Sequence, residues 1–91
     1  MTDTTTLTLQ VRLLAQVLSL SGNVEPAERF ARLHDELVAQ PRGTRLREIV
    51  DELLASSRVA QQHAFDLEAR EAFAKVWTAA KAVQRGGDAA G

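Results

Sequence analysis

The chain has 91 residues, of which 45 % are apolar and 25 % are charged, and its formal net charge is −1. This length accommodates one domain with one hydrophobic core, and the composition is that of a globular protein. The near-neutral charge argues against general coating of nucleic acids, which needs a basic excess. Cysteine is absent, so no disulfide stabilises the fold, and this fits a reducing compartment.

Nine of the eleven basic residues are arginine, which together with abundant alanine indicates the codon usage of a GC-rich, bacterial genome. No positively charged segment precedes the apolar stretch 7–20, so it does not resemble a signal peptide. No apolar run approaches the roughly 20 residues that span a bilayer. We therefore expect a cytoplasmic bacterial protein.

The stretch 7–20 predicts the first helix, because its main apolar residues recur at i, i+4, i+7 and i+11: Leu7, Val11, Leu14 and Leu18. Three further residues widen this face: Leu13, Val17 and Leu20. Residues 6–11 alternate with period two, as a strand would, but consecutive leucines at 13 and 14 break that alternation. So wide an apolar arc exceeds what a small monomer covers comfortably. We expect this helix to lie in a homodimer interface.

Ser21-Gly22-Asn23 predicts a turn, and Pro26 suits the first turn of a second helix. The buried face of that helix is expected to comprise Ala27, Phe30, Leu33, Leu37 and Val38. Residues 40–43 end it. Thr44 is a plausible N-cap for a third helix. The apolar face of the third helix is expected to comprise Leu46, Ile49, Val50, Leu53 and Leu54.

Ser56-Ser57 predicts a break, after which residues 58–85 indicate one long helix. Apolar residues in it follow a heptad spacing: Phe65, Ala69, Ala72, Val76, Ala79 and Val83. Residues 86–91 predict a flexible tail. The expected fold is therefore an all-α bundle of three to four helices in a single domain, 1–85. The first helix and the segment 65–83 are expected to form most of the dimer contact.

Residues 33–35 are Leu-His-Asp, and residues 38–40 are Val-Ala-Gln. With one residue inserted after Asp35, the segment 28–40 resembles the phospho-acceptor box of sensor histidine kinases. That box has a Leu-His-Asp core followed by Val-x-Gln on a helical hairpin. The resemblance implies a free phosphotransfer module that uses His34. The interpretation we favour is a histidine at the boundary of the core, held by a hydrogen bond.

His63 and Asp66 lie one helical turn apart, as do Glu68 and Glu71. A carboxylate-bridged metal site in a bundle needs Glu-x-x-His motifs, and this chain has none. The chain also lacks a glycine-rich phosphate loop and a nucleophile elbow. We therefore expect no enzyme activity, no metal and no cofactor.

Residues 41–47 hold the densest positive charge, from Arg42, Arg45 and Arg47 at the expected start of the third helix. The free N–H groups there favour anions, so these arginines are candidate anion ligands. A small DNA-binding regulator that reads the major groove with the third helix is one alternative function. Glu48 and nearby acids would face phosphates badly, so an ordinary soluble turn is the interpretation we favour.

Trp77 is the only tryptophan and lies beside Phe73, away from the centre of the heptad spacing. A large aromatic residue at the rim of an alanine-rich face is typical either of the core or of a partner-binding anchor. We take Trp77, Phe73, Phe65 and Val76 as candidate partner-binding residues. The function we favour is a small protein–protein interaction module (an adaptor, inhibitor or assembly factor) that acts as a homodimer. A DNA-binding regulator and a His34 phosphotransfer module are the alternatives.

Overall fold

The computed structural model describes residues 4–62 and 65–90, and the regular structure within these ranges is entirely α-helical. This confirms the predicted all-α bundle. The helices are α1 (Thr5–Leu20), α2 (Val24–Val38), α3 (Thr44–Ala55), α4 (Ser57–Gln62) and α5 (Leu67–Ala90).

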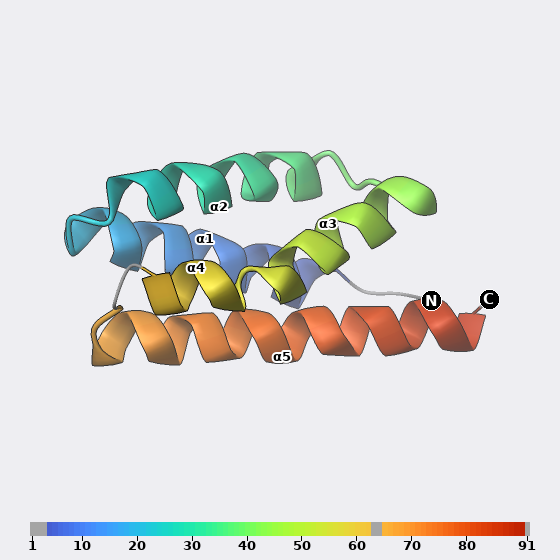
Figure 1. Cartoon of the computed structure of the whole chain (residues 1–91). Coiled ribbons are helices and arrows are strands. Elements are labelled where there is room, and N and C mark those ends of the chain that lie inside the picture. Colours follow the sequence, from blue (N-terminus) through green and yellow to red (C-terminus); the bar gives the residue numbers. More distant parts are fainter. Residues whose placement is uncertain (1–3, 63–64, 91) are drawn as a thin grey trace.

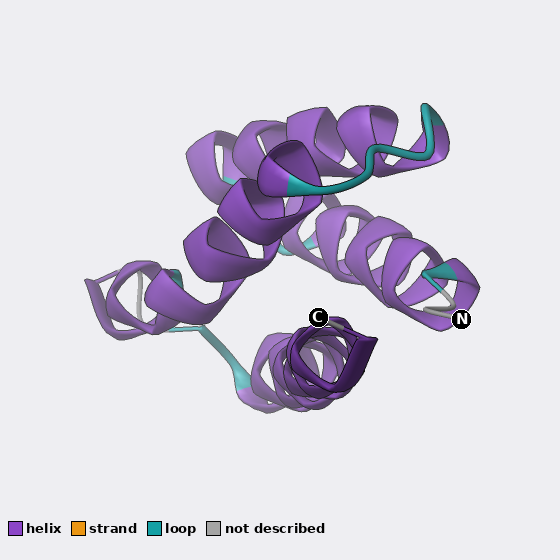
Figure 2. Cartoon of the chain, turned by 90° about the vertical axis from the view of Figure 1, so that its right-hand side faces the viewer, coloured by secondary structure: helices purple, strands orange, loops and turns teal. Residues whose placement is uncertain are grey.

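The helices run along the long axis of a bundle that measures 38 × 20 × 17 Å (Figure 1). α2 returns antiparallel to α1, and α5 runs along the opposite side of the molecule from α2. Seen along the bundle, α5 lies between α1 on one side and the α3–α4 segment on the other (Figure 2). α1 is therefore held between α2 and α5, which are its two main neighbours.

The central face of α1 is completely buried within its own chain, since Leu7, Val11, Leu14 and Leu18 all have 0 % exposure. The expectation that this face needs a second copy to cover it is wrong. The reason is that α2 and α5 both pack against α1. Small residues on α5 allow close approach of its backbone: Ala69, Ala72, Ala79 and Ala80.

The turn between α1 and α2 is a Schellman motif centred on Gly22. The backbone N–H of Asn23 donates to the carbonyl oxygen of Leu18 at 2.9 Å, and that of Gly22 donates to Ser19 at 3.3 Å. Gly22 has a φ of +85°, which lies in the left-handed region that glycine adopts without a Cβ penalty. The predicted stop signal thus closes α1 and reverses the chain into α2.

The α2–α3 connection differs from prediction at its cap. Gly43, with a φ of +61°, is the N-cap of α3, and Thr44 is already the first helical residue. Away from this connection, an ion pair joins the two helices, because the guanidinium of Arg29 on α2 lies 3.5 Å from the carboxylate of Glu52 on α3.

The predicted break at Ser56-Ser57 is present, since α3 ends at Ala55 and α4 begins at Ser57. The single long helix predicted over 58–85 is wrong, because α4 ends at Gln62 and α5 starts at Leu67. The chain reverses between them, so that α5 runs back beneath α3 and α4 (Figure 1). α5 also continues to Ala90, beyond the helix end that the sequence predicted at residue 85.

Two local interactions start α5 after this reversal. The Asp66 carboxylate accepts a hydrogen bond from the backbone N–H of Ala69 at 2.9 Å, which is an N-cap interaction. The Nε of Arg70 donates to the carbonyl oxygen of Phe65, also at 2.9 Å. The Phe65 side chain is buried, so it anchors the start of α5 in the core.

Candidate functional site

The predicted anion ligands do not form one site. The guanidinium of Arg45 donates hydrogen bonds to the carboxylates of Glu36 on α2 and Glu48 on α3, the latter at 3.0 Å. These hydrogen bonds, led by the one to Glu36, raise the pKa of Arg45 above its usual value. The charge of Arg45 is thus compensated by carboxylates of the same chain. Of the three predicted anion ligands, only the exposed Arg42 and Arg47 are left.

The four candidate partner-binding residues divide between core and surface. Phe65 and Val76 are buried in the chain's own core and present no surface to a partner. Phe73 is partly buried against Phe30. Trp77 is 41 % exposed, with the Lys81 ammonium 5.1 Å from its ring centroid. Trp77 alone retains the exposure that a partner-binding residue needs.

The residues considered as metal ligands have other positions. His63 lies outside the described residues. Asp66 caps α5, while Glu68 and Glu71 are exposed on it. In the described part of the chain, no three His, Asp or Glu side chains gather closely enough to hold a metal ion.

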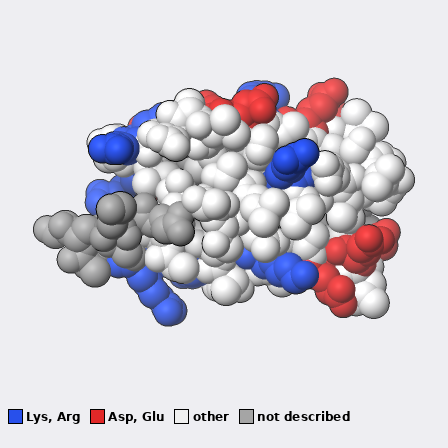
Figure 3. All heavy atoms as spheres, turned by 180° about the vertical axis from the view of Figure 1, so that it is seen from behind, with Lys and Arg blue, Asp and Glu red and all other residues white. Residues whose placement is uncertain are grey.

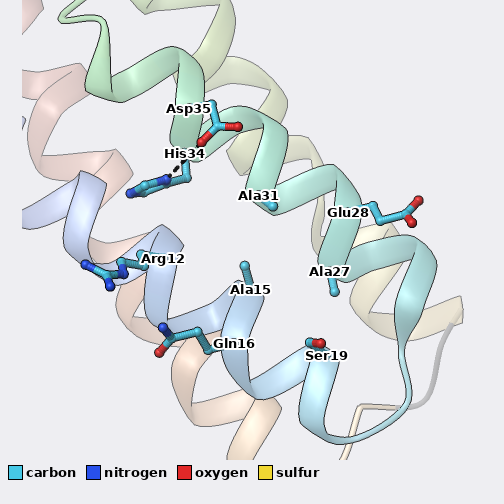
Figure 4. Close-up of a pocket in the computed structure, with 9 residues that line it drawn as sticks. All are labelled: Arg12, Ala15, Gln16, Ser19, Ala27, Glu28, Ala31, His34 and Asp35. Carbon is cyan, nitrogen blue, oxygen red and sulfur yellow. Dashed lines mark ion pairs between the residues drawn. The ribbon is translucent and has the colours of Figure 1, made fainter.

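His34 lies on the wall of a groove between α1 and α2, and 23 % of its side chain is exposed. Its Nδ1 is 3.4 Å from the Asp35 carboxylate. The groove has a volume of about 380 Å³, and Figure 4 shows the residues that line it. Its floor consists of small residues from both helices: Ala15, Ala27 and Ala31. The helices therefore approach closely there and leave a shallow depression.

A second depression of about 290 Å³ continues along the same two helices toward Gln40. Arg12 and His34 line both depressions, so they stand on opposite walls at the junction between them. Arg12 comes from α1 and His34 from α2, and the imidazole ring projects across toward α1 (Figure 4). Sequence reasoning identified His34 but not Arg12, because the two residues are distant in the sequence.

The side of α1 that faces away from the core carries a second apolar row. Leu9, Leu13 and Leu20 are 50 %, 41 % and 89 % exposed, and Gln16 between them is exposed as well. We call these four residues the outer seam of α1. Their spacing of 4, 3 and 4 is that of a coiled-coil contact. It repeats the spacing of the buried row with an offset of two residues, which places it on the opposite side of the helix.

The surface around the outer seam carries little charge. Arg12 is the sole charged residue of α1. Figure 3 looks onto the side of the molecule where α1 lies and shows a broad uncharged area, with most charged side chains toward its edges. The sequence assigned Leu13 and Leu20 to the margin of the core face. The heptad spacing that begins at Leu9 could have shown that Leu13 and Leu20 belong to a row of their own and not to the core face.

Comparisons with protein families, curated proteins and solved structures find no match to this chain. Among the described helices, none combines the length and the apolar character that crossing a membrane requires.

Proposed function

We propose that this chain is a small helical interaction module that self-associates through the outer seam of α1. One observation carries the proposal: Leu9, Leu13 and Leu20 are exposed at coiled-coil spacing on a helix whose other face is already buried. An exposed, regularly spaced apolar row of this kind is characteristic of protein–protein contact sites.

The outer seam is suited to pairing with a copy of itself. In an antiparallel pair of α1 helices, Leu9 would lie opposite Leu20 of the partner subunit. Leu13 would lie opposite Gln16 of the partner subunit about the same midpoint. Every contact is then repeated by the two-fold axis, as an isologous dimer requires. Gln16 supplies a polar position in the row, and such positions help to fix the register and orientation of paired helices.

The charge distribution also favours a second copy. The outer seam contains no charged residue, so two copies meet without like-charge repulsion at its centre. The net charge of −1 adds little repulsion between whole molecules. The exposed parts of three leucines from each subunit would be removed from water, which favours association.

Sedimentation equilibrium over a concentration series tests this function. We expect a dimer for the wild-type chain at tens of micromolar or above, and a monomer for Leu13→Glu, which places a charge in the centre of the seam. Leu67→Glu is the matched control, because Leu67 is 71 % exposed but lies on α5 outside the seam. It should remain dimeric.

Circular dichroism spectra of both variants should match the wild type, because all substituted side chains are solvent-exposed in the isolated chain. A wild-type chain that stays monomeric at several hundred micromolar would refute the proposal. So would a Leu13→Glu chain that dimerises as strongly as the Leu67→Glu control.

Sequence-specific DNA binding through residues 42–47 has less support than self-association. Arg45 is engaged by Glu36 and Glu48, and Arg29 is paired with Glu52. The acidic side chains of α3 therefore accompany the basic ones, which weakens the attraction to phosphates on which such binding depends.

A further inference from the structure

We propose that the groove between α1 and α2 binds a small oxyanion, a carboxylate or a phosphate, between the guanidinium of Arg12 and the imidazole of His34. The groove lies between α1 and α2 and adjoins the outer seam, with which it shares Gln16 and, in its continuation, Leu9. It rests on three features of the groove: an unpaired cation, an oriented histidine and an apolar floor.

Arg12 is the unpaired cation. It lines both depressions of the groove, and no carboxylate of the described residues accepts a hydrogen bond or ion pair from it. By contrast, Arg29 and Arg45 each pair with glutamates. A guanidinium presents a planar fork of N–H donors that matches the two oxygens of a carboxylate or phosphate. Arg12 therefore has donors available on the wall of the groove.

His34 supplies the second wall. Its Nδ1 faces the Asp35 carboxylate at 3.4 Å, which leaves Nε2 as the ring nitrogen available to the groove. In Figure 4 the ring projects toward α1, while the carboxylate of Glu28, another lining residue, extends away from Arg12 and His34. When the ring is protonated, Nε2–H becomes a charged donor opposite the guanidinium. An oxyanion placed between them would receive hydrogen bonds from both helices.

The rest of the lining fits a small ligand. Ala15, Ala27 and Ala31 provide an apolar floor for a methyl or methylene group next to the anionic end. Gln16 and Ser19 add uncharged polar groups on the α1 side. The charged residues that line the groove are Arg12 on α1 and Glu28, His34 and Asp35 on α2.

A nuclear magnetic resonance titration of the full chain tests the site, with sodium acetate in one series and inorganic phosphate in another, each at constant ionic strength. We expect saturable shifts of the His34 ring and the Arg12 side chain in at least one series. The series that saturates identifies the oxyanion.

Variants separate a specific site from general charge attraction. Arg12→Ala and His34→Ala should each weaken binding at least fivefold, and Arg12→Lys should weaken it less than Arg12→Ala. Arg32→Ala is the matched control, because Arg32 is exposed on α2 but does not line the groove. Shifts that never saturate in either series, or an affinity that falls equally in Arg12→Ala and Arg32→Ala, would overturn the proposal. Leu13→Glu should bind as the wild type does, which separates this result from that of self-association.

Discussion

The ring of Phe30 on α2 meets the ring of Phe73 on α5, with 6.4 Å between the centroids and an interplanar angle of 57°. This tilted arrangement is one that aromatic pairs favour. Phe30 is fully buried and Phe73 partly so. The contact links two helices that lie on opposite sides of the bundle, and it therefore couples the N-terminal hairpin of α1 and α2 to the last helix.

This aromatic pair should show measurable coupling. We expect the variants Phe30→Leu and Phe73→Leu, combined in a double-mutant cycle, to give an interaction free energy of about 0.5–1.5 kcal/mol. Urea denaturation followed by circular dichroism measures the free energy of unfolding of all four proteins. Strictly additive effects would mean that the rings contribute through burial alone.

Adjacent leucines on α1 should respond very differently to truncation. Leu14 is fully buried, so Leu14→Ala should lower the free energy of unfolding by about 2–5 kcal/mol through lost burial and a residual cavity. Leu13 is 41 % exposed, and Leu13→Ala should cost far less. Both are measured by thermal and urea unfolding at low micromolar concentration, where monomers dominate. Equal losses would contradict the orientation of α1.

The N-cap of α5 should be important for stability. Asp66→Ala removes the acceptor of the Ala69 N–H and should lower the free energy of unfolding by about 1 kcal/mol. Asp66→Asn keeps a side-chain oxygen at the same place and should retain most of the stability. If both substitutions were neutral in urea denaturation, the Asp66 carboxylate would not serve as a cap.

Substitution of Gly22 by a residue with a side chain should destabilise the turn between α1 and α2. Gly22→Ala forces a Cβ into the left-handed region at φ +85° and should destabilise the chain by about 1 kcal/mol. No atom lies within 4 Å of the position that the Cβ would occupy, so the cost arises from the backbone and not from a clash. Gly22→Asn should cost less, because asparagine adopts this conformation more readily. Melting temperatures of the three proteins would rank these effects, and an Ala variant as stable as Gly would contradict the Schellman turn.

Apolar periodicity predicted α1, α2 and α3 and most of their buried residues. It worked because each of these helices turns a row of large apolar residues toward the core, with polar residues on much of the opposite side. The turn at Ser21-Gly22-Asn23 was predictable for a different reason. Glycine favours the backbone conformation that ends a helix.

Periodicity failed between α4 and α5. Phe65 and Ala69 continue the heptad spacing on the sequence, and this spacing favoured one long helix. In the structure Phe65 is buried, while Asp66 caps the following helix. The cap residue was present in the sequence, but the apolar spacing outweighed it. The chain reversal allows α5 to pack against both α1 and α3, which a continuous helix would not achieve.

The sequence alone determined that the chain is helical, where α1, α2 and α3 lie and which apolar rows in them can be buried, because these properties depend on residues within a few turns of one another. It identified the buried row of α1 but could not show that Leu13 and Leu20 lie outside the core, since that depends on where α2 and α5 pack. Nor could it bring Arg12 opposite His34, or Glu36 to Arg45. These contacts join residues from different helices, and only the tertiary packing sets the distances between them.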